Sequence, residues 1–383
     1  MLKKFSVTNF KNFDHKVTFD LGNPANYSFN SEIIKNGIKT KGIFLGINGS
    51  GKSNFALALF DIILHLTDKE RILEKYNPYL NLGSNKKVAE FEYLFVFDGI
   101  DVLYRYKKTG PLDLVSESLS INGNEVLEYD FGTKEGYVSL KGAENLQLSS
   151  ELTSETDKLS RVKVVRSNAL LQDNVINRVF SSFMSFVDSM LMFYSLDERG
   201  YQGLSVGTDR LSDGIVEAGK LEGLEEFLRS EGIDYNLIPS NTNGVQEIYC
   251  KFGKSMVNIF EIASTGTKSL ILLYYWYIKM NKASLVFIDE YDAFYHFALS
   301  KNIVEMLKEI TDVQIFLSTH NTDLISNDLL RPDVYFEISN NDINTFDKST
   351  SKELRSAHNL QKMYKAGAFD GTPDKPSNGA CNG

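Results

Sequence analysis

The stretch Gly42-Ile-Phe-Leu-Gly46-Ile-Asn-Gly-Ser-Gly51-Lys52-Ser53 decides how the rest of the chain is interpreted. It opens with a compact apolar run, Gly42–Gly46, that predicts a buried strand. The residues that follow fit the pattern G-x-x-x-x-G-K-[ST] at every fixed position. Apolar residues then recur at helical spacing over Asn54–Leu66. The stretch therefore predicts a strand, a phosphate-binding loop (the P-loop) and a helix in direct succession.

The predicted P-loop supplies the residue types that phosphate binding requires. Its glycines let the backbone wrap closely around phosphates, and the helix N-terminus directs N–H groups at the negative charge. Lys52 is expected to reach the β- and γ-phosphates, and the Ser53 hydroxyl to ligate Mg²⁺. The alternative is a glycine turn that merely starts a helix, which the strand-loop-helix context disfavours. The residues expected to contact the nucleotide are Gly46, Asn48, Gly49, Ser50, Gly51, Lys52, Ser53 and Asn54.

A second apolar run supplies carboxylates. Leu285-Val-Phe-Ile-Asp289-Glu290 ends in two acidic residues. In a parallel sheet the carboxyl end of such a strand lies at the ligand-binding edge, beside the P-loop. Asp289 is then expected to hold Mg²⁺, and Glu290 to polarise the water that attacks the γ-phosphate. Taken alone, an acidic strand end is usually a solvated edge, and it is the upstream P-loop that favours catalysis.

A third apolar run, Val313–Ser318, is followed closely by His320. One helix, Ala298–Ile310, and one turn fit between Asp289 and this run. We therefore expect two neighbouring parallel strands, with His320 at a strand tip as a sensor of the γ-phosphate. Of the other histidines, His296 follows the carboxylates closely and is kept as a candidate.

The segment Ala263-Ser-Thr-Gly-Thr-Lys268 precedes a predicted helix, Thr267–Met280. The simplest interpretation is an N-cap, because serine and threonine commonly start helices. A capped helix N-terminus is also an anion site. Ser264, Gly266 and Thr267 are therefore candidate ligands of a second phosphate-binding element.

The rest of the pattern combines strands and helices. Alternating runs separated by turn residues predict an antiparallel meander. The expected strands are Lys4–Phe10, Lys16–Asp20, Phe91–Phe97, Asp101–Tyr106, Leu119–Ile121 and Val126–Tyr129, with a hairpin over Val245–Phe260. Asn168–Leu196 and Lys220–Arg229 are helical in pattern.

Composition narrows the function classes. Fifty acidic residues against 41 basic give a net charge of −9, which argues against a protein coated in positive potential for nucleic acid; a local basic groove remains open. The longest apolar run, Leu270–Ile278, is too short for a bilayer, which needs about 20 residues. The start lacks an apolar signal core, and two cysteines provide neither a disulfide framework nor a metal quartet. A cytoplasmic protein without membrane contact is expected.

The order of these motifs resembles the ABC-type ATPase heads of the SMC, RecF and OLD kind. It is most similar to the compact AAA-type ATP-binding proteins of bacterial anti-phage and abortive-infection loci. The segments that carry the resemblance are Asn9–Phe13, Gly49–Asn54, Ser264–Thr267 as the signature loop, Ile288–Glu290 with His296, Ser318–His320 and Tyr364–Phe369. The signature differs from the transporter type, Leu-Ser-Gly-Gly-Gln, so a transport ATPase is poorly supported. Gln172 is the candidate for the glutamine that the family uses as a further Mg²⁺ ligand.

The resemblance implies an α/β fold with a mixed sheet, whose core is parallel, an antiparallel β-subdomain and a helical lobe. Residues 1–135 and 255–372 would form the two halves of the ATPase head. Residues 136–254 would form the helical lobe, and 373–383 a disordered tail.

The resemblance also implies a function. In the family two heads sandwich ATP, and each signature loop completes the P-loop site of the other head. Ser264 and Gly266 would then contact a γ-phosphate across a homodimer or a higher oligomer. We expect an ATP-hydrolysing, Mg²⁺-dependent switch in anti-phage defence, with a separately encoded nuclease or toxin as effector. The alternatives are a RecF-like DNA-repair ATPase and a non-hydrolysing, ATP-bound scaffold that sequesters a toxin.

Overall fold

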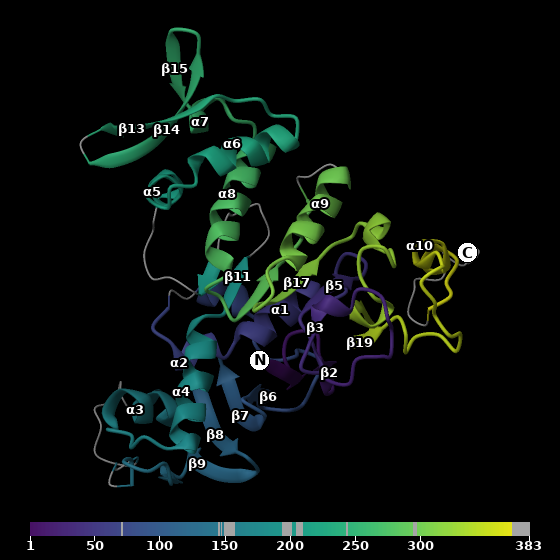
Figure 1. Cartoon of the computed structure of the whole chain (residues 1–383). Helices are drawn as coiled ribbons and strands as arrows, with labels where there is room; N and C mark the ends of the chain where they lie inside the picture. The colour runs from purple at the N-terminus through teal and green to yellow at the C-terminus, as the bar shows by residue number, and fades with distance from the viewer. Residues whose placement is uncertain are drawn as a thin grey trace, which may run out of the picture.

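A computed structural model describes residues 1–69, 72–144, 146, 148, 158–193, 201–203, 210–242, 244–293 and 297–369 (Figure 1). Within this described part, two seven-stranded sheets form the frame of the molecule. One sheet has a parallel core, and the other is antiparallel throughout. The predicted fold class, a mixed α/β head with a parallel core and an antiparallel subdomain, is confirmed.

The parallel sheet has the strand order β12-β11-β16-β17-β5-β18-β19. Its strands are β5 (Lys41–Leu45), β11 (Leu191–Phe193), β12 (Tyr201–Gly203), β16 (Leu285–Ile288), β17 (Gln314–Ser318), β18 (Tyr335–Ser339) and β19 (Asp342–Thr345). Only the edge strands β12 and β19 pair antiparallel. Strands β5, β16 and β17 are buried along their whole length, as expected for a parallel sheet that is covered on both faces. The carboxyl ends of the five parallel strands therefore meet at one edge.

Helices connect and cover the parallel strands (Figure 1). They are α1 (Lys52–Phe60), α8 (Thr265–Met280) and α9 (Phe297–Lys308). The short helix α2 (Ile63–Leu66) follows α1 and contacts helices beside the antiparallel sheet. The predicted single helix over Asn54–Leu66 begins two residues earlier and is broken after Phe60. The two intervening residues, Asp61 and Ile62, keep right-handed helical backbone angles. The Asp61 carboxylate accepts from Tyr79 and from Tyr106 and Lys108 of the antiparallel sheet.

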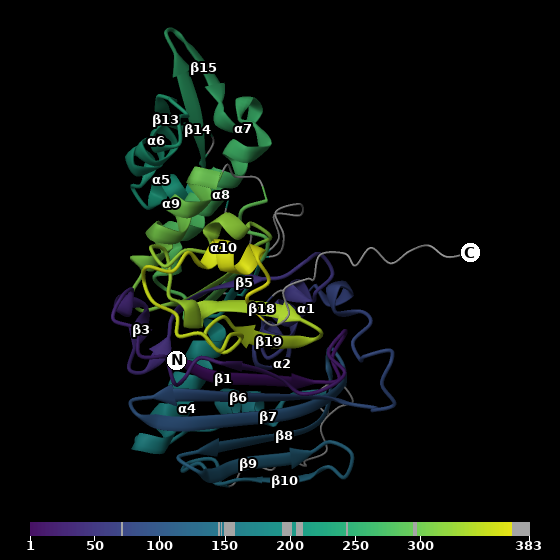
Figure 2. The same ribbon diagram turned by 90° about the vertical axis from the view of Figure 1, so that its right-hand side faces the viewer.

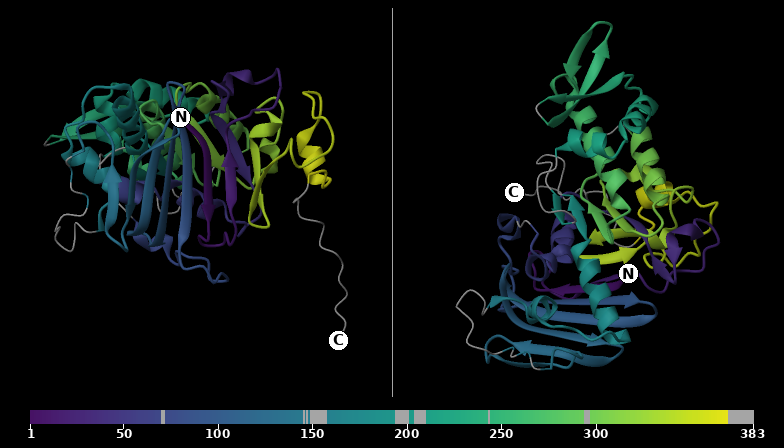
Figure 3. Two further views of the ribbon diagram at one scale, coloured as in Figure 1. Left: turned by 90° about the horizontal axis from the view of Figure 1, so that it is seen from below. Right: turned by 60° about the vertical axis from the view of Figure 1, so that its left-hand side comes forward.

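The antiparallel sheet has the order β10-β9-β8-β7-β6-β1-β2, which confirms the predicted meander (Figures 2 and 3). Its strands are β1 (Leu2–Thr8), β2 (Val17–Asp20), β6 (Ala89–Phe97), β7 (Ile100–Gly110), β8 (Asp113–Ile121), β9 (Asn124–Asp130) and β10 (Glu135–Val138). Helix α4 (Val175–Asp188) lies across one face, where Phe183 packs on Phe95 and Tyr104. Helix α3 (Arg161–Asn168) contacts α2 beside it. The other face of the sheet is open to solvent.

A third region projects beyond the parallel sheet, along helix α8 (Figures 1 and 2). It consists of α5 (Leu211–Glu217), α6 (Leu221–Ser230), α7 (Ile259–Ile262) and the three-stranded sheet β13 (Leu237–Thr242), β14 (Val245–Phe252) and β15 (Ser255–Asn258). The predicted hairpin and the helix over Lys220–Arg229 are confirmed. The short elements elsewhere are β3 (Ile34–Lys35), β4 (Ile38–Lys39), η1 (Ser31–Ile33), η2 (Leu73–Tyr76), η4 (Thr322–Leu324), η5 (Pro332–Val334) and α10 (Leu360–Lys365).

The middle of the chain departs most from expectation. The helical pattern over Asn168–Leu196 resolves into the end of α3, a turn and α4, and Leu191–Phe193 is a strand that pairs in parallel with β16. A short apolar run cannot be assigned to helix or strand by periodicity alone, and here the neighbouring strand decides. Residues 136–254 do not form one helical lobe in the described part. They contribute to the antiparallel sheet, the parallel sheet and the projecting region in turn. The predicted tail and His296 lie outside the described residues.

Candidate nucleotide-binding site

The P-loop leaves β5 at the carboxyl edge of the parallel sheet and enters α1. Gly46, Gly49 and Gly51 all have positive φ angles, of 152°, 79° and 108°, which L side chains rarely adopt. A Cβ on Gly46 would lie 2.6 Å from Ser50 Oγ, and one on Gly51 would lie 2.5 Å from Asn12 Nδ2. Glycine is therefore favoured at all three positions by conformation, and at Gly46 and Gly51 by space as well.

Lys52 is the first residue of α1, and its side chain folds back over the loop. Its Nζ donates to Gly46 O at 2.8 Å and to Ile47 O at 3.3 Å, and it lies 3.1 Å from His320 Nε2. Only 5% of the residue is exposed. Burial lowers the pKa of the Lys52 ammonium, and the nearby carboxylates of Asp289 and Glu290 counteract that shift. A buried cation that donates to two carbonyl oxygens, and that forms no direct ion pair with any described residue, is suited to an anionic ligand.

The acidic residues after β16 are held by the tip of β17. The buried hydroxyl of Ser318 donates to Asp289 Oδ1 and accepts from the backbone N–H of Glu290 at 2.8 Å. Glu290 has a φ of 45°, in the left-handed region that non-glycine residues seldom adopt. This turn points the two carboxylates in different directions. Asp289 is buried, whereas the Glu290 side chain is 40% exposed.

His320 joins the group from the adjacent strand. Strands β16 and β17 pair in parallel, with Ile288 opposite Leu317, so the predicted neighbouring strand tips are confirmed. His320 Nε2 lies 3.6 Å from Glu290 Oε1 and 3.1 Å from Lys52 Nζ. Three predicted site residues from three separate elements therefore converge at this edge of the sheet.

One residue beside the P-loop was not assigned a role from the sequence. The Asn12 amide accepts from Asn54 Nδ2 at 2.8 Å and donates to Asn341 Oδ1 at 2.9 Å, while it packs against Gly51. Asn12 thus connects the start of α1 to the turn between β18 and β19. It belongs to the Asn9–Phe13 segment that carried the resemblance, but periodicity alone gave no reason to place it at the site.

The predicted signature residues lie elsewhere in the chain. Ser264 is the N-cap of α8, and its Oγ accepts from the N–H of Thr267 at 3.1 Å. This end of α8 lies beside the projecting region, away from α1 (Figure 1). Ser264 is exposed, Gly266 is half-buried and Thr267 is buried. These residues do not join the P-loop of the same chain, and their role as phosphate ligands stays a prediction.

Gln172 is exposed in the turn before α4. Its N–H donates to Lys141 O at 3.0 Å, and its carbonyl accepts from the side chains of Asn174 and Asn177. These neighbours belong to neither the P-loop nor the strand tips. The assignment of Gln172 as a Mg²⁺ ligand stays a prediction without structural support.

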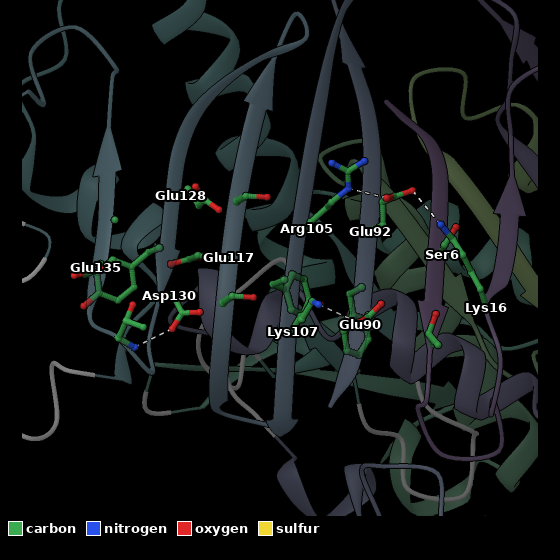
Figure 4. Close-up of a pocket in the computed structure, with 18 residues that line it drawn as sticks. Ser6, Lys16, Glu90, Glu92, Arg105, Lys107, Glu117, Glu128, Asp130 and Glu135 are labelled. Carbon is green, nitrogen blue, oxygen red and sulfur yellow. Dashed lines mark hydrogen bonds and ion pairs between the residues drawn. The ribbon is translucent and has the colours of Figure 1, made fainter. Parts of the chain in front are cut away.

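A sizeable hollow lies elsewhere on the described surface and does not coincide with this site. It has a volume of about 580 Å³ and lies on the open face of the antiparallel sheet (Figure 4). Its cations are already matched, because Arg105 and Lys16 contact Glu92 and Lys107 contacts Glu90. Volume alone therefore does not identify the chemically active region.

The residues at the strand edge fit Mg²⁺-ATP as a ligand. The buried Ser50 Oγ has no hydrogen-bond partner in the part of the chain that the structure describes, so the glycine loop offers an unused polar atom as well as space. Ser53 is exposed at the start of α1, and Asp289 supplies a carboxylate at the end of β16. Mg²⁺ commonly takes one or two protein oxygens and completes its shell with water and phosphate. Among the described residues, no group of three or more His, Cys, Asp or Glu side chains could hold a metal ion by itself.

Strand, P-loop, helix and acidic strand tip together define a P-loop nucleotide-binding protein. The chain belongs to the family described as AAA domain, putative AbiEii toxin, Type IV TA system, whose model matches residues 43–326. This membership confirms the resemblance to the AAA-type proteins of abortive-infection loci. A search of curated proteins found no match.

Solved structures that are similar to the chain are SMC head domains. The SMC head domain from Thermotoga maritima is 16% identical, with a TM-score of 0.41, and the match covers 84% of this chain and 89% of that one. The Smc head domain from Pyrococcus yayanosii, with a coiled coil and joint, is 12% identical, with a TM-score of 0.47, covering 95% and 99%. A Pyrococcus furiosus head, bound to the C-terminal domain of ScpA, is 17% identical, with a TM-score of 0.42, covering 90% and 95%. Within the described residues, no helix has the length and apolar character needed to span a membrane.

Proposed function

We propose that this protein is an ATP-hydrolysing switch whose heads dimerise around ATP. The observation that carries the proposal is the convergence of Lys52, Glu290 and His320 from α1, β16 and β17, with 3.1 Å and 3.6 Å between neighbouring groups. A cation, a carboxylate and an imidazole beside a glycine loop are the parts that phosphoryl transfer to water requires.

Each residue has a distinct task in this proposal. Lys52 binds the β- and γ-phosphates and exchanges its carbonyl partners for them. Glu290 accepts the proton of the attacking water, which its exposed side chain can reach. His320 contacts the γ-phosphate, so that the position of the strand tip depends on whether this phosphate is bound. Ser53 and Asp289 hold Mg²⁺, which neutralises charge on the phosphate oxygens when bound.

The position of the predicted signature residues supports the proposed dimer. Ser264 and Gly266 lie at an exposed helix N-terminus, which is favourable for an anion. Because this end of α8 lies apart from the P-loop of its own chain, a second copy is the natural source of the phosphate. ATP binding would then join two heads, and hydrolysis would release them.

The first test uses Glu290→Gln. This variant should bind ATP with wild-type affinity but hydrolyse it about 10²–10⁴-fold more slowly, because it lacks the general base. It should also accumulate as an ATP-bound dimer. Phosphate release and size-exclusion chromatography with and without ATP measure both effects. An unchanged rate of hydrolysis would contradict the role of Glu290.

The second test separates the signature role from simple capping. Ser264→Arg should bind ATP but neither dimerise nor turn over, because the larger side chain fills the space of the partner's phosphate. Ser264→Asn is the matched control, since asparagine caps helices as well as serine does. An ordinary cap predicts that Ser264→Arg loses about 0.5–2 kcal/mol of stability with unaltered turnover. Melting temperature and ATPase rate, measured together, distinguish the two.

The biological setting proposed is anti-phage defence, with a separately encoded effector. The supporting observation is membership of a family described by a toxin and a toxin–antitoxin system. The proposal assigns ATP hydrolysis to this chain and nucleic-acid cleavage or toxicity to the effector. The purified protein should therefore hydrolyse ATP without cleaving DNA or RNA. Cleavage that survives in Lys52→Ala and Glu290→Gln would contradict a separate effector.

A further inference from the structure

Asp292 lies in the turn after β16, on the same segment as Glu290, and contacts the segment that carries His320. Its Oδ2 accepts from Thr319 Oγ1 at 2.7 Å. The same Thr319 oxygen accepts from the N–H of Asn321 at 2.8 Å. The hydroxyl of a fully buried residue thus connects the acidic turn to the backbone on the far side of His320.

This contact determines the geometry of the His320 segment. A hydroxyl can donate only one hydrogen bond, and Thr319 donates it to the Asp292 carboxylate. The lone pairs of the Thr319 oxygen are then directed at the N–H of Asn321. The N–H of Thr319 donates to Phe44 O, at the end of the strand that leads into the P-loop. The residues on both sides of His320 are therefore held, while its own ring is 37% exposed and contacts Lys52 and Glu290.

We propose that Asp292 is a positioning residue, which sets the location of the His320 imidazole through the Thr319 hydroxyl. The proposal rests on the proposed function, in which His320 contacts the γ-phosphate. Asp292 fixes the distance between the turn that carries Glu290 and the turn that carries His320. A displacement of about 1 Å between reacting groups can cost about 10²-fold in rate, so a contact of this kind has a measurable effect on turnover.

The experiment compares single and combined variants. Asp292→Ala should lower kcat by about 10- to 100-fold and leave the affinity for ATP unchanged. Thr319→Val removes this hydrogen bond together with the one that Asn321 N–H donates to the same oxygen, so it should lower kcat at least as much as Asp292→Ala does. The double variant should lose no more than Thr319→Val alone. Asp292→Asn should retain most of the activity, because its amide oxygen accepts the same bond. Asp323→Ala is the matched control, since that carboxylate contacts Gln361 and Lys365 at the surface and should show the wild-type rate.

The decisive test measures the effect of Asp292→Ala in a protein that already carries His320→Ala. If Asp292 acts through His320, Asp292→Ala should cause no further loss of kcat in that background. A purely structural role would instead lower the melting temperature and reduce the rate equally in both backgrounds, which would overturn the proposal. Full activity of Asp292→Ala, or of His320→Ala, would also overturn it.

A measurement without turnover keeps the inference separate from the proposed function. The imidazole NMR signals of His320 in nucleotide-free protein, assigned with His320→Ala, should shift in Asp292→Ala and Thr319→Val. Those of His358, which accepts from the N–H of Arg355, should not. If wild-type protein fails to hydrolyse ATP while the His320 signals still shift, the function fails and the positioning contact stands. Unchanged His320 signals overturn the contact whatever the ATPase result.

Discussion

Helix α1 has a buried lysine near each end, and the two lysines have different partners. At the N-terminal end, Lys52 contacts two carbonyl oxygens and an imidazole. At the C-terminal end, Lys108 of β7 donates to Asp61 Oδ1 at 2.6 Å, and neither side chain is exposed to solvent. Tyr79 and Tyr106 donate to the same carboxylate. Among the described residues, the cation at one end of the helix forms no direct ion pair, whereas the cation at the other end forms a buried one.

The difference shows where an anionic ligand can bind. A fully paired lysine gains little from a phosphate, because the carboxylate would have to be separated from it first. Lys52 would exchange its two carbonyl partners for a charged one in the proposed site, and hydrogen bonds to a charged acceptor are stronger. The open face of the antiparallel sheet resembles the C-terminal end of α1 in this respect, because its cations already form ion pairs with Glu90 and Glu92 (Figure 4).

The largest expected effect tests the N-terminal end of α1. Lys52→Ala should abolish ATP binding, because it removes the main positive charge on the β- and γ-phosphates. Lys107→Ala, which removes an exposed lysine paired with Glu90 at 3.1 Å, is the control and should bind ATP as the wild type does. Isothermal titration calorimetry measures both affinities. Wild-type binding by Lys52→Ala would show that the two ends of the helix do not differ in this way.

The second effect tests the C-terminal end. Lys108→Met leaves the Asp61 carboxylate buried without its cation and should lower the free energy of unfolding by about 3–5 kcal/mol. The double variant Asp61→Asn, Lys108→Met removes both charges and should lose clearly less than the single variant. Chemical denaturation monitored by circular dichroism gives both values. Equal losses in the two variants would mean that packing, not charge, dominates at this site.

The sequence predicted the N-terminal end of α1, with Lys52, far better than the C-terminal end, with the ion pair of Asp61 and Lys108. The P-loop pattern is local, and its glycines are required by φ angles that only they adopt easily. The neighbouring strand tips that precede Glu290 and His320 were also predictable, because near-continuous apolar runs of strand length, separated by a helix, are typical of a parallel sheet. The contact between Asp61 and Lys108 joins residues far apart in the chain, and no local pattern marks it. Leu191–Phe193 was missed for the same reason, since its strand depends on pairing with β16.

A third prediction extends the comparison to a buried carboxyl group that forms no ion pair with any described residue. Glu337 of β18 is 1% exposed, lies opposite Leu45 of β5, and accepts from Tyr364 OH at 3.0 Å. Burial raises the pKa of Glu337 from 4.5 to about 7. Because the folded state then holds the proton more tightly than the unfolded state, Glu337 contributes stability below pH 4.5 that is lost as the pH rises to 7.

The loss over this range should be roughly 3 kcal/mol at one pKa unit per 1.36 kcal/mol. Glu337→Gln, which is neutral at every pH, should show a correspondingly flatter dependence of stability on pH and be more stable than the wild type at pH 8. Asp61→Asn is the comparison, because the carboxylate it replaces has a cation beside it. Urea denaturation at several pH values between 4 and 8 provides the measurement. An identical pH slope in Glu337→Gln and in the wild type would show that this carboxyl titrates normally.

The smallest effect is expected on the open face of the antiparallel sheet. Arg105 Nε donates to Glu92 Oε2 at 2.7 Å, but the two side chains are 53% and 28% exposed, so that water and salt screen their attraction. Arg105→Ala should therefore change the free energy of unfolding by less than about 1 kcal/mol, and the change should shrink further in high salt.

ATP turnover of Arg105→Ala should equal that of the wild type, because Arg105 points away from the helices that cover the other face. The neighbouring strand positions on β7 point inward, and there Tyr106 and Lys108 contact Asp61 at the end of α1. A turnover that falls in Arg105→Ala while stability is preserved would mean that the sheet transmits a change from its open face to that helix, and the two regions would then have to be treated as one functional unit.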